Sequence, residues 1–148
     1  MNSMAQRICR PLLLALGLGA ALPSLAQDAH RLPPEKLSSA WVLLNTKVDA
    51  DVPNSGKNMD KPGCVAVSYL IGSDGLTRNV QVRKVVPQSD LGPVAASIVA
   101  RFKYGPMLSN THEDAVSTYY IVPFNAPDDP KQRDQLMQAC RLPGYDQG

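Results

Sequence analysis

The residues best suited to catalysis lie together in one polar segment, at Ser109, His112, Glu113 and Asp114. A serine, a histidine and a carboxylate make up a hydrolytic triad, in which the histidine accepts the serine proton and the carboxylate orients the histidine. Such a triad needs rigid elements to hold its members, because a single loop does not fix three side chains relative to one another. We therefore interpret these residues as solvated loop side chains and expect no enzymatic activity.

The sequence gives little support for a metal or phosphate site. Cys64, Cys140 and His112 are zinc-ligand types, but they lack paired ligand spacing and a fourth ligand. Gly72 and Gly75 flank a tight turn between two apolar runs, whereas a phosphate-binding loop is followed by a helix. We expect no metal and no cofactor.

The first 26 residues predict a secretory signal peptide. Arg7 and Arg10 precede an apolar run from Leu12 to Leu22, and Ser24-Leu25-Ala26 has the small-x-small pattern of a cleavage site. The alternative is an uncleaved inner-membrane anchor. The uncharged stretch around this run is shorter than the roughly 20 residues of a spanning helix, which favours cleavage and export.

Export changes the charge and the chemistry of the cysteines. The chain has 15 Lys+Arg and 13 Asp+Glu, so loss of Arg7 and Arg10 with the signal leaves 13 of each and a formally neutral protein. No basic stripe with interleaved aromatic residues is present, so we expect no nucleic-acid partner. Cys9 leaves with the signal, and Cys64 and Cys140 remain as an even pair in an oxidising compartment. We expect them to form a disulfide; the alternative is two buried free thiols.

The clearest structural pattern is a β-hairpin. Cys64–Ile71 alternates with apolar residues in both sets of positions, which predicts a strand with neighbours on both sides. Asp74-Gly75 is a preferred hairpin turn because both residues tolerate positive φ. Leu76–Val86 then predicts a second strand, which ends before Pro87.

A helix and a third strand follow the hairpin. We expect Asp90 to cap a helix whose apolar stripe runs from Leu91 to Phe102, and Gly105-Pro106 to stop it. Ala115–Phe124 predicts a third strand, and Pro123 favours an edge position because proline has no N–H. Antiparallel pairing then places the first strand between the other two. The predicted fold is α+β, with a three-stranded antiparallel sheet and a ββαβ core.

Short helices are expected to flank this core. Leu37, Ala40, Trp41 and Leu44 have the spacing of one helix face, although the same segment also suits a strand. Asp128-Asp129-Pro130 predicts the start of a C-terminal helix. The expected organisation is a signal peptide at 1–26, a leader and short N-terminal element at 27–52, a central domain at 53–126, and a C-terminal helix and tail at 127–148.

The ordered motifs between Pro53 and Phe124 resemble the C-terminal domain of TonB, the periplasmic energy transducer of Gram-negative bacteria. They include a proline ten residues before the glycine that opens the first strand, and the Asp-Gly turn. The chain departs from the family at Val52, where the family has tyrosine, and it has no long proline-rich spacer. The residues that carry the likeness are Val65, Val67, Ile71, Asp74-Gly75, Leu91, Ala95, Ala96, Phe102-Lys103-Tyr104-Gly105-Pro106 and Val122-Pro123-Phe124.

The resemblance implies a periplasmic module that docks an extended protein or peptide segment, such as part of an outer-membrane receptor, beside its last strand. Transferred to this chain, the docking edge is Tyr119, Tyr120, Ile121 and Val122. Backbone groups supply such a contact, so few special side chains are needed. This implies a link to TonB-dependent outer-membrane transport. The alternative for this strand is an edge covered by the C-terminal helix.

A second hypothesis is an envelope structural or assembly protein that dimerises through its sheet edges and has no transport role. Trp41, Tyr104, Tyr119 and Tyr120 would form an aromatic patch for such contacts, whereas core burial is commoner for these residue types. Concentration-dependent mass from light scattering separates a homodimer from a monomeric peptide binder.

Overall fold

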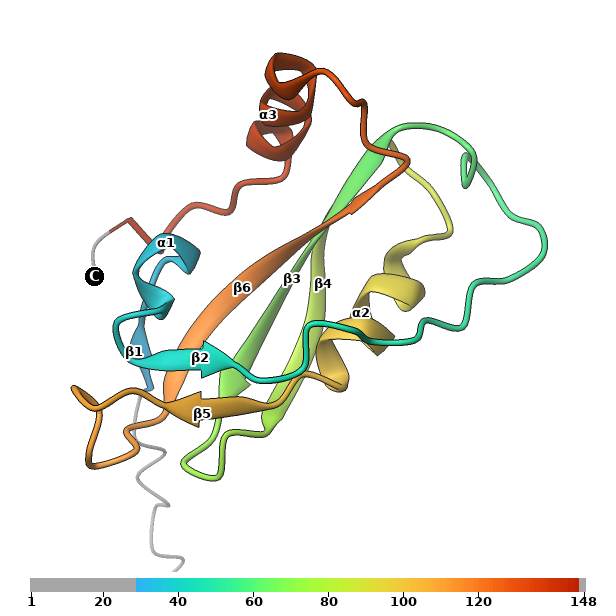
Figure 1. Ribbon diagram of the computed structural model, residues 1–148. Helices are drawn as coiled ribbons and strands as arrows, with labels where there is room; N and C mark the ends of the chain where they lie inside the picture. The colour runs from blue at the N-terminus through green and yellow to red at the C-terminus, as the bar shows by residue number, and fades with distance from the viewer. Residues whose placement is uncertain (1–28, 147–148) are drawn as a thin grey trace, which may run out of the picture.

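A four-stranded sheet in the order β1-β6-β3-β4 forms the centre of the computed structural model, which describes residues 29–146 (Figure 1). A separate two-stranded ribbon pairs β2 with β5. The expected signal peptide at 1–26 lies outside the described residues. No helix within residues 29–146 is long and apolar enough to cross a membrane. The elements are β1 His30–Arg31, α1 Pro34–Leu37, β2 Trp41–Leu43, β3 Gly63–Ile71, β4 Thr77–Val86, α2 Gly92–Ala100, β5 Tyr104–Pro106, β6 Val116–Phe124 and α3 Pro130–Ala139.

The predicted α+β class is confirmed, but the predicted three-stranded sheet is wrong. β3 does lie between β4 and β6 and pairs antiparallel with both. The additional strand, β1, pairs parallel with the start of β6, where His30 lies opposite Val116 and Arg31 opposite Ser117. Two polar residues carry no hydrophobic alternation, so this strand forms through its neighbour rather than through a local sequence preference.

The hairpin turn between β3 and β4 follows its sequence pattern closely. Gly75 has a φ of 75°, and its N–H donates to the Gly72 carbonyl at 2.8 Å. The Asp74 carboxylate accepts from the Leu76 N–H at 3.1 Å and pairs with Arg78 at 2.7 Å. The hydrogen bonds from Arg78 hold the pKa of the Asp74 carboxyl well below its usual range. Local side-chain chemistry therefore fixes this turn.

The predicted N-terminal helix stripe is wrong beyond Leu37. Helix α1 has only four residues, and Trp41–Leu43 instead forms β2, which pairs antiparallel with β5. The segment Gly105-Pro106 lies in β5 rather than directly ending a helix, since α2 already ends at Ala100. Pairing between segments about 60 residues apart in sequence overrides the helical periodicity here.

The two helices that flank the core begin differently from each other. Asp90 was expected to cap α2, but α2 has no side-chain cap, and the Asp90 carboxylate instead accepts from the Lys57 N–H at 2.7 Å. In α3, the Asp129 side chain accepts from the Gln132 N–H at 2.9 Å, as its position before Pro130 suggests. The predicted start of α3 is confirmed.

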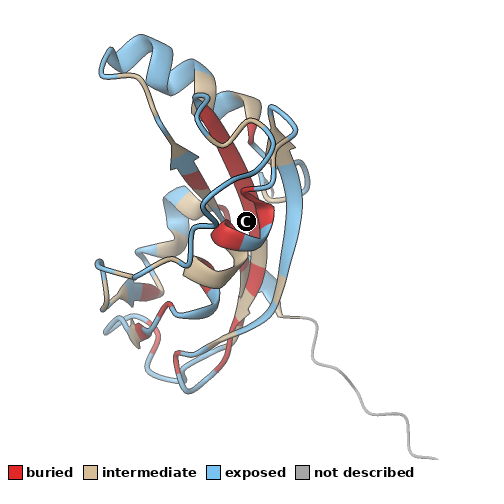
Figure 2. Ribbon diagram, turned by 90° about the vertical axis from the view of Figure 1, so that its right-hand side faces the viewer, coloured by how far each residue is buried: buried red, intermediate tan, exposed pale blue. Residues whose placement is uncertain are grey.

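Alternation along β3 divides the interior into two clusters, one on each face of the sheet. Val65, Val67, Tyr69 and Ile71 face α2 and the β2–β5 ribbon, together with Trp41. The opposite face carries a smaller cluster of Cys64, Ala66, Tyr119 and Cys140, and α3 covers it. Buried residues concentrate on β3, whereas α3 has no buried residue and β4 is largely exposed (Figure 2). Helix α3 is therefore an outer layer rather than part of the main core.

Candidate functional site: the outer side of β6

Along β6, the backbone N–H and C=O groups of every second residue point away from β3. The register is continuous from Phe124 to Val116, and Pro123, which has no N–H, lies opposite Cys64. In an antiparallel ladder, the residues that bond to the neighbour alternate with residues that bond outward. The Ser117 carbonyl accepts from Leu32, on the side away from β3, so Ser117 is an outward position, and Tyr119, Ile121 and Pro123 share its parity. Pro123 therefore leaves the β3–β6 ladder intact.

Strand β1 uses only the first part of this outer side. The Leu32 N–H donates to the Ser117 carbonyl at 2.9 Å, and the chain then turns at Pro33 into α1. Proline has no N–H with which to continue the ladder, so β1 ends there. Within residues 29–146, no strand lies beside β6 from Tyr119 onward. We call Tyr119–Val122 the docking edge.

The structure corrects the expectation that β6 is an edge strand along its whole length. Val116 and Ser117 are covered by β1, and only the later residues lack a neighbouring strand on that side. Figure 1 shows α1 and α3 at separate points along the outer side of β6, with the middle of the strand between them. The uncovered length is short, which suits recognition of a short extended segment.

A groove of about 280 Å³ runs along the docking edge. The ion pair between Arg141 Nη2 and Glu35 Oε1, at 3.2 Å, connects the two walls of this groove. Both side chains are about half exposed, so this pair is weakly held and can separate at little cost. The groove is lined by Pro34 and Glu35 of the α1 wall, by Tyr119, Tyr120 and Ile121 of β6, and by Asp134, Met137, Gln138 and Arg141 of the α3 wall.

The four predicted docking residues differ in their surroundings. Tyr119 is buried against the Tyr145 ring, at a centroid distance of 4.9 Å, and burial raises the pKa of its phenol. Val122 is also buried, and Ile121 is half-buried. Tyr120 is 39% exposed and packs edge-on against Phe102 at 5.1 Å. The accessible features of this edge are therefore backbone groups and one aromatic ring.

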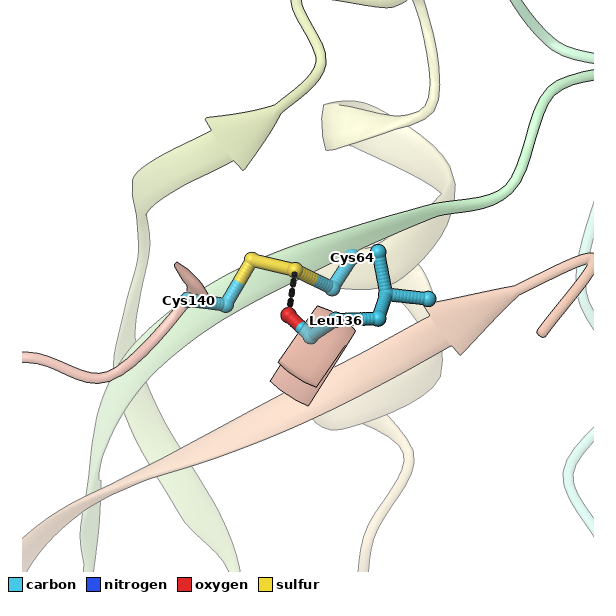
Figure 3. The surroundings of a disulfide bond; sticks show 3 residues. All are labelled: Cys64, Leu136 and Cys140. Atoms are coloured by element: carbon cyan, nitrogen blue, oxygen red, sulfur yellow. Dashed lines mark hydrogen bonds between the residues drawn. A yellow bond between two sulfur atoms is a disulfide. The ribbon is translucent and has the colours of Figure 1, made fainter. Parts of the chain in front are cut away.

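A disulfide between Cys64 and Cys140 attaches the end of α3 to β3. Figure 3 shows the bond beside Leu136, whose carbonyl oxygen lies 3.2 Å from the Cys64 sulfur. The alternative of two free thiols is thereby excluded. Because α3 itself has no buried residue, the disulfide and the apolar side chains around it hold this wall of the groove in place.

The other candidate sites do not assemble in the structure. Ser109 donates its hydroxyl proton to the Ser39 carbonyl rather than to His112, and His112, Glu113 and Asp114 are exposed. The disulfide occupies both cysteines of the zinc hypothesis. Within residues 29–146, no group of three or more His, Cys, Asp or Glu side chains is arranged to hold a metal ion.

The expected aromatic patch is wrong. Trp41, Tyr104 and Tyr119 are at most 6% exposed, so only Tyr120 of the four residues reaches the surface substantially. Trp41 packs in the main core and donates its indole N–H to the Asp114 carbonyl at 3.1 Å. The rings of Trp41, Tyr104 and Tyr119 therefore stabilise the fold and do not form the expected aromatic patch.

The family model described as the Gram-negative bacterial TonB protein C-terminal matches residues 52–125, which is half of the chain. The chain belongs to the TonB C-terminal family. Its structure is also similar to the solution NMR structure of the Pseudomonas aeruginosa TonB C-terminal domain, with 19% sequence identity and a TM-score of 0.41. That likeness covers 60% of this chain and 89% of the other. No curated protein matches the chain.

Members of the TonB C-terminal family are periplasmic in Gram-negative bacteria, take part in envelope energy transduction, and interact with proteins such as outer-membrane receptors. The matched range contains β3, β4, α2, β5 and β6, and therefore the docking edge itself. It does not contain α1, α3 or Cys140. Both walls of the groove thus lie outside the part of the chain that matches the TonB family model.

Proposed function

We propose that this TonB C-terminal domain binds an extended protein segment in the periplasm by strand addition at the docking edge, as part of TonB-dependent outer-membrane transport. The observation that carries this proposal is the outward backbone of Tyr119 and Ile121, beside which no strand lies within residues 29–146. The domain acts by binding and performs no catalysis in this proposal.

The geometry of β1 supports the same mode of binding. β1 pairs with the start of β6 through backbone groups, so this side of the sheet already accepts a strand. A guest strand would continue the same row of pairing after Pro33 turns the chain away. Main-chain hydrogen bonds would supply affinity, and the flanking side chains would supply specificity.

A proline substitution at Ile121 tests the proposal. Ile121 has the same outward parity as the native Pro123, so Ile121→Pro removes an outward N–H while leaving the ladder to β3 in place. The matched control is Val82→Pro, because Val82 is an exposed position on β4, at the opposite edge of the sheet.

The assay is the change in backbone amide resonances on titration with a synthetic peptide of alternating threonine and valine. We expect the amides of Tyr119 and Ile121 to shift in the wild type and in Val82→Pro, and to lose that response in Ile121→Pro. Circular dichroism and urea unfolding check that both variants remain folded. The proposal is wrong if saturating peptide leaves these amides unshifted in the wild type.

A second candidate function is self-association through the other edge of the sheet. Strand β4 has ten residues and exposes Val82, and within residues 29–146 it pairs only with β3. Exposed Arg83 and Lys84 on the same strand oppose close pairing of two copies, because basic edge residues discourage strand-to-strand contact. Light scattering over a range of concentrations tests this alternative. It predicts that the mass of the wild type rises toward that of a dimer as the protein concentration increases, and that Val82→Lys remains at the mass of a monomer.

A further inference from the structure

We propose that the groove beside the docking edge selects an extended segment carrying a lysine or arginine, whose side chain enters between α1 and α3. This inference rests on the proposed strand docking and specifies the chemistry of the docked segment. It concerns the two walls of the groove, which lie outside the range matched by the TonB family model.

The charges that line the groove are unequal. Two carboxylates, Glu35 and Asp134, face one guanidinium, Arg141. Arg141 pairs with Glu35, whereas Asp134 belongs to none of the three ion pairs found among residues 29–146. Among the residues that line the groove, there is therefore one more negative than positive charge, and the unmatched carboxylate is on the α3 wall. A cation in the docked segment would complete the pairing, and an anion would be repelled by Asp134.

The uncharged part of the lining suits the stem of a long basic side chain. Ile121 and Met137 present methyl groups and a thioether along the groove. Lysine and arginine place their methylene chains on apolar surface and keep the charged group at a polar rim.

Glu35 also contributes to this selection. Its pair with Arg141 is about half exposed on both sides, and exposed ion pairs of this kind add little to the stability of a protein. An entering lysine or arginine therefore competes effectively with Arg141 for the Glu35 carboxylate. We infer that the cation is held between Glu35 and Asp134, one from each wall.

The test uses the alternating threonine–valine peptide with one central guest residue: lysine, arginine, glutamine or glutamate. The affinity of each peptide is measured from the amide shifts of Tyr119 and Ile121. We expect the lysine and arginine peptides to bind about fivefold more tightly than the glutamine peptide, and the glutamate peptide more weakly still. This advantage should shrink as NaCl rises from about 0.02 M to about 0.5 M, because salt screens exposed charges.

Substitutions at Asp134 connect the preference to the groove. Asp134→Asn should remove most of the preference for basic peptides, and Asp134→Lys should reverse it in favour of the glutamate peptide. Asp128→Asn is the matched control, since it removes an equal charge close to the start of α3 but outside the groove. It should leave the order of affinities unchanged.

The possible outcomes separate the two proposals. If all four peptides cause the same amide shifts and bind with the same affinity, strand docking stands and the selection of a basic side chain is overturned. The selection would also be overturned if the wild type binds the glutamate peptide most tightly, or if Asp134→Asn keeps the full preference for basic peptides. If no peptide shifts these amides, the proposed docking function itself is wrong. If the protein dimerises and the dimer does not bind peptide, the groove binds a second copy of this chain, and the selection of a basic side chain is overturned.

Discussion

Removal of the disulfide gives the sharpest test of how the groove is built. The change is a double substitution, Cys64→Ala with Cys140→Ala, because both cysteines are fully buried and alanine leaves no unpaired polar group there. The bond joins positions 76 residues apart in the sequence. In the chain-entropy model, a loop of this length corresponds to about 4.5 kcal/mol of lost stabilisation. Small domains typically have about 5–15 kcal/mol of stability, so the effect is large.

The assay is urea unfolding of the wild type and the double variant, with and without reducing agent. We expect the free energy of unfolding to fall by about 3–5 kcal/mol in the double variant, and by a similar amount in the reduced wild type. The denaturant slope should rise in both, because the uncrosslinked unfolded chain exposes more surface. Reducing agent should have no effect on the double variant, which makes it the control for side reactions.

Hydrogen exchange locates the loss within the structure. Helix α3 has no buried residue, so its amides should lose protection first, while the amides of β3 and β6 remain protected. The double variant should then still dock the threonine–valine peptides but no longer prefer basic ones, because α3 carries Asp134. A loss of under about 1 kcal/mol with α3 still protected would refute this reasoning. It would mean that packing of Leu136, Leu142 and Tyr145 holds the helix without the bond.

Three further predictions concern the turn, the core and the N-terminus. Gly75→Ala should cost about 2 kcal/mol or more in urea unfolding, since Gly75 has a φ of 75° and an added Cβ would lie 2.1 Å from the Tyr104 carbonyl oxygen; Ser73→Ala is the neutral comparison. Burial raises the pKa of Tyr104 from 10.0 to about 12, which favours the neutral phenol in the folded state. The stability from this shift is therefore present below pH 10 and is lost as the pH rises from 10 to about 12. In stability measurements with tyrosinate absorbance, the loss over this pH range should be smaller in Tyr104→Phe than in the wild type; part of it remains, because burial also raises the pKa of Tyr69. Intact mass of the protein from fractionated envelopes should show a soluble species that begins at Gln27, whereas a membrane-bound species retaining Met1 would contradict the signal-peptide prediction.

Much of the fold follows from short-range sequence patterns. The β3–β4 hairpin could be predicted because alternation and an Asp-Gly turn act over a few residues, and the observed turn uses those same groups. The start of α3 was predictable for the same reason, since Asp129 and Pro130 act within one helical turn. Patterns of this kind depend on neighbours along the chain, which the sequence displays directly.

The elements that sequence patterns missed all depend on distant partners. β1 has only two residues, His30 and Arg31, and forms because its backbone pairs with β6. Trp41–Leu43 becomes a strand because β5 lies beside it. Asp90 was expected to cap a helix, but its carboxylate instead meets the Lys57 N–H more than 30 residues away. Local propensity does not contain these partners.

The sequence by itself determined the hairpin, the central helix, the last strand, the cysteine pair and the resemblance to the TonB family, because each depends on local periodicity or on an ordered set of motifs. Only the tertiary structure decided how much of β6 remains uncovered, since β1 and α1 reach it from the other end of the chain. The groove also depends on the placement of α3, which carries Asp134, is joined to β3 by the disulfide and lies across the groove from α1, far from it in sequence. Side chains acquire a shared electrostatic environment only when folding brings them together, so the charge of the groove is a property of the tertiary structure.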